Sequence, residues 1–244
     1  MLVTPEIQAQ FDTAKNIVFM TGAGISTPSG IPDYRSKNGL YQGNTLQPEY
    51  LLSATAFQVA PEMQYQFMKE NMYFPDAAPN VIHDKMAQFT QKGQARIITQ
   101  NVDDLHERAG SSNVLHLHGE LNKARSSFDE SYIVDCFGDQ KLEDKDPNGH
   151  PMRPYIVFFG EMVPMLERTI NIVVQADVVL VIGTSLQVYP ANGLVNEAPS
   201  KATIYLIDPN PNTGFVRKHV IAIKEKAGMG VPKVVRVLLD KIKD

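Results

Sequence analysis

The chain has 244 residues, enough to bury a sizeable core in one large domain or in one domain with an insert. Its composition, 43% hydrophobic and 20% charged, is typical of a soluble globular protein, and its net charge of −4 is not that of a nucleic-acid-binding surface. The sequence has no apolar run of about 18 residues, no signal-peptide pattern at its start and only one cysteine, Cys136, so we expect a cytoplasmic protein without a membrane span or an internal disulfide.

The N-terminal part of the chain leads into a glycine-rich segment. A short helix is expected over residues 5–15, and the apolar run 17–20 predicts a buried strand. Gly22 and Gly24 follow, and because they have no Cβ their backbone N–H groups can approach a phosphate. This arrangement favours a dinucleotide ligand, although a Gly-x-Gly pair alone is equally consistent with a tight turn.

The same segment differs from the loop of hydride-transfer dehydrogenases. Thr27 replaces the third glycine of their fingerprint, and no strand with a terminal acid follows about 20 residues later. Pro28 and Pro32 cannot lie inside a regular helix. We therefore interpret residues 22–36 as a long flexible loop over a cofactor.

The middle of the chain alternates helical and extended patterns. Residues 50–74 are helical and rich in Met, Phe and Tyr, which we interpret as a stripe facing the core. A turn at 75–80 and a helix over about 80–91 follow, and the next two strands are expected at 96–99 and 114–118.

The stretch from Asn122 to His150 has a different character. It is polar and acidic, with a small apolar nucleus that includes Phe128, Tyr132 and Phe137. We interpret it as a small inserted module or a long loop outside the main sheet.

Apolar strands and helices alternate again in the last part of the chain. Strands are expected at 155–159, 178–182 and 203–207, and helices at 164–175, 190–198 and 232–243. Such alternation predicts an α/β fold, with a doubly wound (Rossmann-like) parallel sheet covered by helices on both faces and a smaller inserted module.

Four of the predicted strands end in polar sequences. These are Gly22-Ala23-Gly24, Gln100-Asn101-Val102-Asp103, Gly183-Thr184-Ser185 and Asp208-Pro209-Asn210-Pro211. Each alone is consistent with a helix cap or a turn. Together they favour one extended ligand site, because ligands of such sheets bind at the carboxyl ends of the strands.

His118 ends the strand expected at 114–118 and is the candidate general base, because an ordinary histidine has a pKa of about 6.5. A packed or capping histidine is the alternative. His116 lies on the same face of the strand, so a metal-binding pair is conceivable, but no further ligands cluster with it in the sequence.

Taken together, these motifs resemble the sirtuin family, the NAD-dependent protein-lysine deacylases, over essentially the whole chain. The matching motifs are Gly22-Ala23-Gly24-Ile25-Ser26, Ser29-Gly30-Ile31-Pro32-Asp33-Tyr34-Arg35-Ser36, Thr99-Gln100-Asn101-Val102-Asp103 with Leu105-His106 and Ala109-Gly110, His118-Gly119, Arg153-Pro154 with Val157, Phe159-Gly160-Glu161 and Pro164, Gly183-Thr184-Ser185 with Val188 and Pro190, and Asn210-Pro211. Each motif is modest alone, but their order and spacing are specific.

The resemblance implies an enzyme that consumes NAD and does not reduce it. The acyl-lysine carbonyl oxygen attacks the nicotinamide ribose as nicotinamide leaves, the general base deprotonates the ribose hydroxyls, and water releases free lysine and O-acyl-ADP-ribose. The implied catalytic residues are His118, Asn101 and Gln100.

The resemblance also implies the two binding sites. Asp103 with Ile31 would hold the nicotinamide amide, and Arg35 would face the phosphates. The full set of implied NAD-binding residues is Gly22, Ala23, Gly24, Ser26, Thr27, Ile31, Asp33, Tyr34, Arg35, Gln100, Asn101, Val102, Asp103, His118, Gly183, Thr184, Ser185, Asn210 and Pro211. The acylated peptide would add as a strand, and the implied substrate-binding residues are Val157, Phe158, Phe159, Gly160, Glu161, Val188 and Met68.

The chain departs from the family in three places. Most sirtuins bind structural zinc through four cysteines between the catalytic histidine and the Arg-Pro motif, whereas this chain has only Cys136 there, so we expect a bacterial-type sirtuin with no metal. Tyr34 replaces the usual Phe and keeps an aromatic ring.

The third departure concerns the acyl group. The branch of the family that removes succinyl groups has a Tyr and an Arg three residues apart. An ungapped count from Pro61 places Met68 and Asn71 at those positions, which favours neutral acyl groups.

The resemblance predicts a single catalytic domain over 1–244. Its large Rossmann-like part would comprise about 1–40, 80–121 and 155–244, and its small parts would be a helical insert at 41–79 and a zinc-free module at 122–154. The expected partners are acyl-lysine proteins or peptides, without nucleic acid or membrane, and the expected state is a monomer.

Three other functions remain open at this point. Protein mono-ADP-ribosyl transfer would also need NAD, and a non-catalytic NAD-binding module would bind it without releasing nicotinamide. A hydride-transfer dehydrogenase is disfavoured by the missing acid after a second strand.

Overall fold

The computed structural model describes residues 9, 13–34, 36, 39–41, 48–93, 95–138, 140–214, 216, 220–227 and 229. The helix expected over 232–243 lies outside these residues, as does most of the one expected over 5–15. Within the described part of the chain, no helix has the length and apolar character needed to cross a bilayer.

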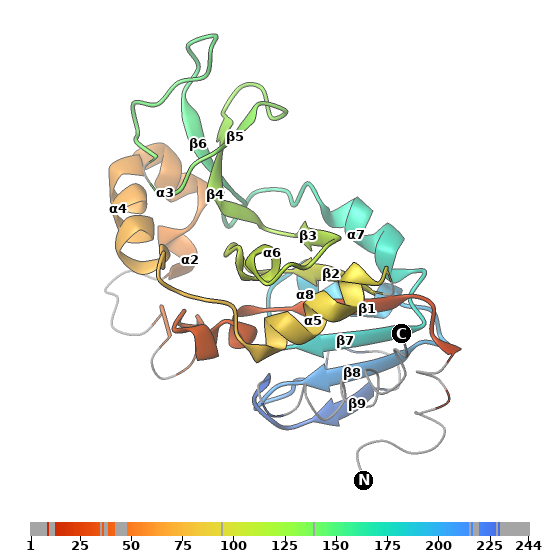
Figure 1. Ribbon diagram of the computed structural model, residues 1–244. Helices are drawn as coiled ribbons and strands as arrows, with labels where there is room; N and C mark the ends of the chain where they lie inside the picture. The colour runs from red at the N-terminus through yellow and green to blue at the C-terminus, as the bar shows by residue number, and fades with distance from the viewer. Residues whose placement is uncertain are drawn as a thin grey trace.

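A six-stranded parallel sheet forms the large part of the molecule (Figure 1). In spatial order its strands are β3 (Val114–His116), β2 (Ala95–Thr99), β1 (Ile17–Thr21), β7 (Val178–Ile182), β8 (Thr203–Ile207) and β9 (Val220–Ile223). β1 and β7 are buried along their whole length. Central strands of a parallel sheet need apolar side chains on both sides, because helices cover both faces.

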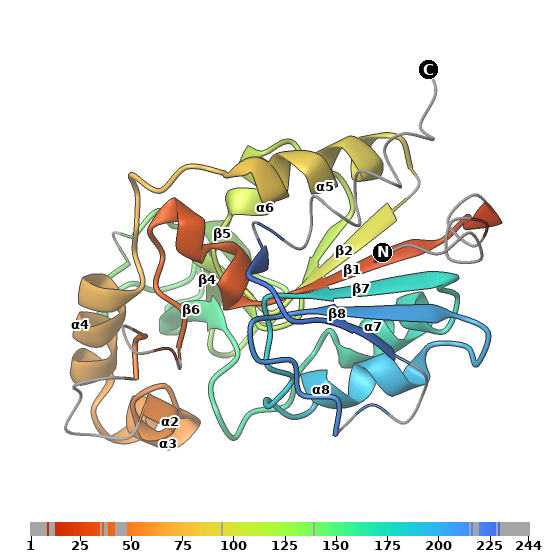
Figure 2. The same ribbon diagram turned by 90° about the horizontal axis from the view of Figure 1, so that it is seen from below.

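Helices lie on the two faces of this sheet (Figure 2). One face carries α5 (Val81–Gln91) and α6 (Leu105–Arg108), and the other carries α7 (Leu166–Val173) and α8 (Ala191–Leu194), which the short 3-10 helix η3 (Val195–Glu197) continues. Two apolar cores result, one between the sheet and α5 and one between the sheet and α7 and α8.

A smaller body stands beside the large sheet (Figure 1), and we call it the small module. Its antiparallel sheet has the order β5 (Ile133–Asp135), β4 (Gly119–Ser126), β6 (Met152–Ile156). Three helices accompany it, α2 (Pro48–Leu51), α3 (Ala54–Val59) and α4 (Pro61–Asn71). They share a separate core of Leu51, Leu52, Phe67, Met68, Leu121, Ile156 and Phe158.

The α/β class, with a doubly wound parallel sheet and a smaller inserted module, is therefore confirmed. The segments expected at 17–20, 80–91, 96–99, 178–182 and 203–207 have the expected structure, with bounds that differ by at most one residue.

We expected residues 155–159 to form a strand of the alternating strands and helices of the main sheet, and this prediction is wrong. The strand in this region, β6, lies at 152–156 and pairs antiparallel with β4 in the small sheet. A five-residue apolar run suits either kind of sheet, and only the partner strand decides between them.

The helical stretch 50–74 is three helices. The first helix ends at Leu51, and Ser53 caps α3, since its Oγ accepts a hydrogen bond of 3.0 Å from the Ala56 N–H. Pro61 begins α4, where its missing N–H leaves no intrahelical bond unmade. Neither α6 nor β9 was expected, because both are only four residues long.

Candidate active site

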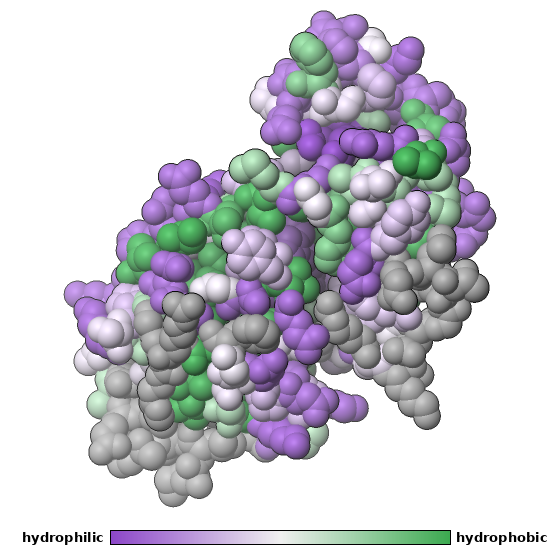
Figure 3. Space-filling view, turned by 180° about the vertical axis from the view of Figure 1, so that it is seen from behind, coloured by the Kyte–Doolittle hydropathy of each residue, from purple (hydrophilic) through white to green (hydrophobic). Residues whose placement is uncertain are grey.

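A cleft of about 1230 Å³ lies between the carboxyl edge of the large sheet and the small module. Figure 3, which views the molecule from behind, shows the small module as an upper lobe and a hollow where it meets the larger lobe. The segments after β1, β2, β7 and β8 reach this cleft, as expected for strands that end at one edge of a parallel sheet.

Most of the residues singled out in the sequence line this cleft. They are Gly22, Ala23, Gly24, Thr27, Ile31, Asp33, Tyr34, Gln100, Asn101, Val102, His118, Val157, Phe158, Phe159, Gly160, Glu161, Gly183, Thr184, Ser185, Val188 and Asn210. Ser26, Asp103, Pro211 and Met68 are not part of the lining, and Arg35 lies outside the described residues.

The glycine-rich segment is folded against the loop after β7. Within the segment that we expected to be a long flexible loop, it forms two short 3-10 helices, η1 (Ala23–Ile25) and η2 (Thr27–Ser29). The Gly22 N–H donates to Ile182 O at 3.0 Å, and the Gly24 N–H donates to Gly183 O at 2.9 Å. These two N–H groups are therefore not the phosphate donors expected from the sequence.

The glycines are needed for a different close approach. A Cβ on Gly22 would lie 2.6 Å from Thr184 Cβ, and one on Gly24 would lie 2.8 Å from Gly183 Cα. The absent side chains let the loops after β1 and β7 pack backbone against backbone, and this packing forms the floor of the cleft.

His118 lies at the junction of the two bodies. Its Nδ1 is 3.1 Å from Gln100 O, and since a carbonyl oxygen only accepts, Nδ1 carries the proton and Nε2 keeps its lone pair. Burial lowers the pKa of His118 below its usual value, against the opposing effect of the Gln100 carbonyl. The imidazole is thus neutral at pH 7 and able to accept a proton in the cleft.

Gly119 makes the position of His118 possible. Its φ of +81° is in the left-handed region, and a Cβ there would overlap Tyr155 O of β6. The next strand, β4, can therefore begin directly after His118 and run into the small module.

The side-chain amide of Asn101 is fixed by two hydrogen bonds from its nitrogen. Its Nδ2 donates to Gly22 O at 3.3 Å and to Ser26 Oγ at 3.1 Å, and these two bonds leave the side-chain oxygen as the group available to a ligand. Ser26 Oγ in turn donates to Asp103 Oδ2 at 2.9 Å. Burial raises the pKa of Asp103, while its bonds from Ser26 and the Leu105 N–H lower it. Ser26 and Asp103 thus support Asn101 without reaching the cleft surface.

The segment 157–161 follows β6 along the cleft, and much of its backbone is already paired. The Val157 N–H donates to His118 O, and the Phe159 N–H donates to Leu52 O. The Phe158 N–H donates to a carboxylate oxygen of Glu161 at 2.9 Å. Two carbonyl oxygens of the segment are paired as well, because the Glu161 N–H donates to Phe158 O and the Ala54 N–H donates to Phe159 O, each at 3.0 Å.

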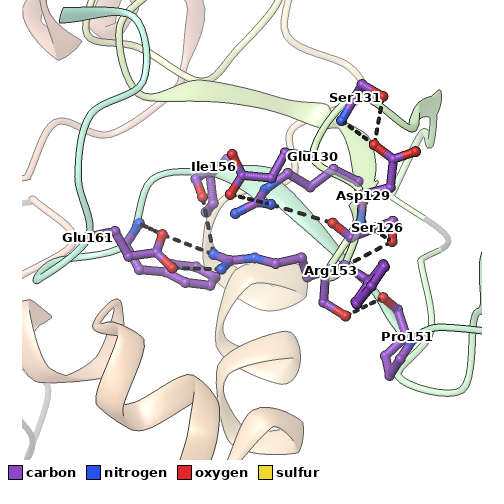
Figure 4. A network of polar contacts seen from close by, with 12 residues as sticks. Ser126, Asp129, Glu130, Ser131, Pro151, Arg153, Ile156 and Glu161 are labelled. Atoms are coloured by element: carbon purple, nitrogen blue, oxygen red, sulfur yellow. Dashed lines mark hydrogen bonds and ion pairs between the residues drawn. The ribbon is translucent and has the colours of Figure 1, made fainter.

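The Arg153 side chain extends to Glu161 and binds this segment (Figure 4). Its two terminal nitrogens donate to the two carboxylate oxygens of Glu161 at 2.6 and 3.0 Å, and one also reaches Ile156 O. The guanidinium lies 4.6 Å from the Phe158 ring centroid and 5.2 Å from that of Phe57. Glu161 is thus engaged with Arg153 although it lines the cleft.

Two residues behave differently from the sequence expectation for the acyl group. Met68 is 2% exposed in the core of the small module, and the cleft is reached instead by Met72, just after α4. Asn71 Nδ2 donates to Phe67 O within the same helix.

Asp208, the first residue of the polar run expected after the strand at 203–207, lines the cleft beside Asn210, and burial raises its pKa, with a smaller contribution from Asp33. Two further cleft residues were not singled out in the sequence. Met162 and Tyr189 line the cleft with side chains that are 90% and 85% exposed. Their position in the sequence could have identified these two residues, because each lies within one residue of a matched motif position.

In the described part of the chain no group of three or more His, Cys, Asp or Glu side chains is placed to hold a metal ion. The absence of zinc stays a prediction.

Comparison with known proteins connects this geometry to a family. The sequence model of the Sir2 family matches residues 22–190. The chain is 61% identical over 199 residues to the NAD-dependent protein deacylase of Aggregatibacter actinomycetemcomitans, covering 81% of this chain and 95% of that one. It is 43% identical over 203 residues to the NAD-dependent protein deacetylase of Listeria monocytogenes serotype 4b (strain F2365), covering 80% and 85%.

Solved structures agree with the fold. A complex of a Sir2 homologue with NAD superposes with a TM-score of 0.84 at 34% identity, covering 98% of this chain and 95% of that one. A Sir2 protein bound to a propionylated peptide superposes with a TM-score of 0.77 at 30% identity, covering 96% and 97%.

Proposed function

The chain belongs to the Sir2 family, and from this premise we propose that it is an NAD-dependent protein-lysine deacylase. It releases nicotinamide and free lysine and transfers the acyl group to ADP-ribose. The observation that carries this function is the meeting of His118 and Asn101 in one cleft at the carboxyl edge of the sheet.

The cleft fits NAD in size and in polarity. Its volume of about 1230 Å³ exceeds the roughly 300–1,000 Å³ of ordinary ligand pockets, which leaves room for a dinucleotide and an acyl-lysine side chain together. Ser185 and Asn210 lie at the ends of β7 and β8 and suit the adenosine, while Asn101 and Ile31 suit the nicotinamide riboside. When bound, NAD supplies the glycosidic bond whose cleavage lets ADP-ribose take up the acyl group.

The chain's own residues handle protons and orientation. His118 accepts a proton from a ribose hydroxyl at Nε2, because Nδ1 is committed to Gln100 O. Asn101 presents its side-chain oxygen to the ribose, because its amide nitrogen is committed to Gly22 and Ser26. Gln100 donates to Thr184 Oγ1 at 3.2 Å and thereby joins the loops after β2 and β7.

The substrate side of the cleft favours a neutral acyl group such as acetyl. Met72 lines this side, and Lys226 is the cationic side chain in the described lining, where it lies with Asp208 and Asn210. An apolar thioether accommodates an alkyl chain and offers no partner to a carboxylate. The described lining brings His118, Asn101 and the segment 157–161 together in one chain, which supports our proposal of a single catalytic domain over residues 1–244 that acts as a monomer. The single cysteine supports our proposal of a cytoplasmic location.

A release assay on acyl-lysine peptides tests this function. The wild type, with NAD, should deacylate an acetyl-lysine peptide faster than the succinyl version of the same peptide. His118→Ala should lower the rate by roughly 100- to 10,000-fold while NAD still binds, because it removes the general base. His150→Gln changes a histidine of the small module and serves as the matched control, which should keep full activity.

Two results would contradict this function. Nicotinamide release without loss of the acyl group would favour protein mono-ADP-ribosyl transfer. Faster removal of succinyl than of acetyl would contradict the neutral acyl preference.

A further inference from the structure

A second histidine, His116, lies two residues before His118 and takes no part in the reaction described above. Its side chain is buried at the end of β3, and both ring nitrogens have partners. Nδ1 is 2.9 Å from Asn101 O, and Nε2 is 3.0 Å from a carboxylate oxygen of Glu107 on α6.

Both of these partners can only accept. A neutral imidazole carries one N–H, so it would leave one of its nitrogens facing an oxygen lone pair without a proton between them. The geometry therefore requires His116 to be doubly protonated, with Glu107 as its counter-ion.

The surroundings of His116 support this charge. Burial alone would lower the pKa of His116, but the hydrogen bond and charge of Glu107, the Asn101 carbonyl and Glu120 on β4 raise it above its usual value. Burial alone would raise the pKa of Glu107, and the bond to His116 lowers it below its usual value. Asp103 and His106 also interact electrostatically with His116, from the segment after β2 and from α6.

His116, the last residue of β3, and His118, two residues after it, bind neighbouring carbonyl groups. His118 holds Gln100 O, and His116 holds Asn101 O. Thr99 Oγ1 accepts from the Asn101 N–H at 3.1 Å. The backbone that carries Gln100 and Asn101 is thus fixed on each side, and its orientation determines where the Asn101 side chain enters the cleft.

We propose that the Glu107–His116 ion pair is a positioning device for this enzyme, in which the His116 imidazolium holds the Asn101 carbonyl and so orients Asn101 and His118 for the reaction. This inference rests on the proposed deacylase function. Neither residue touches the cleft surface. Their effect on the reaction passes through the peptide group that they hold.

The proposal implies two limits to the active pH range. His118 must be neutral to act as a base, so activity rises as the pH passes the lowered pKa of His118. His116 must stay charged, so activity falls as the pH passes the raised pKa of His116. Glu107 sets the upper limit, because its negative charge keeps the proton on His116.

Glu107→Gln tests the upper pH limit. The matched control is Asp104→Asn, which removes a carboxylate from the start of the same helix, where Asp104 pairs with Arg108. The upper limb of the kcat profile of Glu107→Gln should shift to lower pH by about 1 to 3 units, since the opposite charge has gone. Asp104→Asn should leave that limb in place. An unmoved limb in Glu107→Gln would overturn the proposal.

Substitutions at His116 separate positioning from simple packing. An asparagine amide nitrogen overlies Nδ1 of histidine and can still donate to Asn101 O, whereas a glutamine amide reaches toward Glu107. His116→Asn should keep kcat within roughly tenfold, the value of one hydrogen bond. His116→Gln should lower kcat by about 100-fold with little change in the KM of the peptide, since a misplaced catalytic group has that effect. Equal losses of kcat in the two variants would contradict the proposal.

A titration of the histidine side chains by NMR reads the charge without any need for turnover. In the wild type the His116 signals should be those of an imidazolium at pH 7. In Glu107→Gln the His116 ring should lose its proton at a lower pH than it does in the wild type. A neutral His116 at pH 7 in the wild type would overturn the inference. Lack of deacylation by a wild type that holds a charged His116 would instead overturn the proposed function.

Discussion

In the large sheet β1 and β7 bury all five of their residues, whereas β5 of the small module exposes all three of its residues. Exposed apolar side chains in the described small module include Phe128 and Phe137. The large sheet is therefore held by apolar packing on two faces, and the antiparallel sheet of the small module depends more on polar contacts.

Asp146 is the centre of those polar contacts. Its carboxylate accepts hydrogen bonds from Ser126 Oγ at 2.8 Å and from the His150 N–H at 2.9 Å, and it lies 3.1 Å from His150 Nδ1. The His150 ring is stacked on Phe128 at 4.3 Å between centroids. The large sheet thus carries Asn101 after its apolar strand β2, and the small module, whose antiparallel sheet is joined by these polar contacts, supplies the 157–161 side of the cleft.

The largest expected effect concerns the joint between the two bodies. Gly119→Ala should destabilise the protein by about 3 kcal/mol or more, because it combines a positive φ with overlap on Tyr155 O. Gly149→Ala is the matched control, with a φ of +87° and nothing within 4 Å of the added Cβ, and should cost about 1 kcal/mol. Chemical denaturation measures both. Equal losses would show that the close approach at the joint is unimportant.

A smaller effect is expected at the wall of the cleft. Arg153→Met should destabilise by about 2–3 kcal/mol, because it leaves the Glu161 carboxylate half-buried without its cation. It should also raise the KM of the acylated peptide, since Glu161 holds the Phe158 N–H in the substrate segment. Adding Glu161→Leu should recover part of the stability. A peptide KM that stays unchanged in Arg153→Met would argue that this wall does not bind substrate.

The mildest effect is an acid sensitivity of the small module. Burial alone would raise the pKa of Asp146, but hydrogen bonds from His150, Ser126 and Asn148 lower it to about 2. A depressed folded-state pKa means that the stabilisation is complete above the ordinary value of 3.8 and is lost as the pH falls from there toward about 2.

Asp146→Asn should remove this dependence and lower the melting temperature at neutral pH. Near-ultraviolet circular dichroism of the tyrosines can follow unfolding, since the chain has no tryptophan. Asp76→Asn, at the exposed turn before α5, is the control and should melt like the wild type. An unchanged acid limb in Asp146→Asn would refute this role of Asp146.

The sequence predicted the large sheet well for a physical reason. β7 is a continuous apolar run of five residues and β8 has four buried residues after Thr203, and the bounds of both strands were those expected. Such runs are needed wherever a strand is buried on both faces. The polar residues that follow the strands meet in the cleft because parallel strands end at one edge.

Tertiary contacts limited the rest of the prediction. Membership of β6 in the small sheet depends on β4, which pairs with it from a distant part of the sequence. The Gly22 and Gly24 N–H groups donate to the carbonyl oxygens of Ile182, at the end of β7, and of Gly183, more than 150 residues away in the chain. Met68 faces the core and Met72 the cleft, and a helical apolar pattern alone does not distinguish these two faces.

A product balance tests the central claim most directly. The purified protein is incubated with NAD and an acetyl-lysine peptide, and mass spectrometry measures nicotinamide, deacetylated peptide and O-acetyl-ADP-ribose. The account predicts equal amounts of the three in the wild type and a loss of all three in His118→Ala. NAD consumption that leaves the acetyl group on the peptide, or an undiminished yield in His118→Ala, would contradict it.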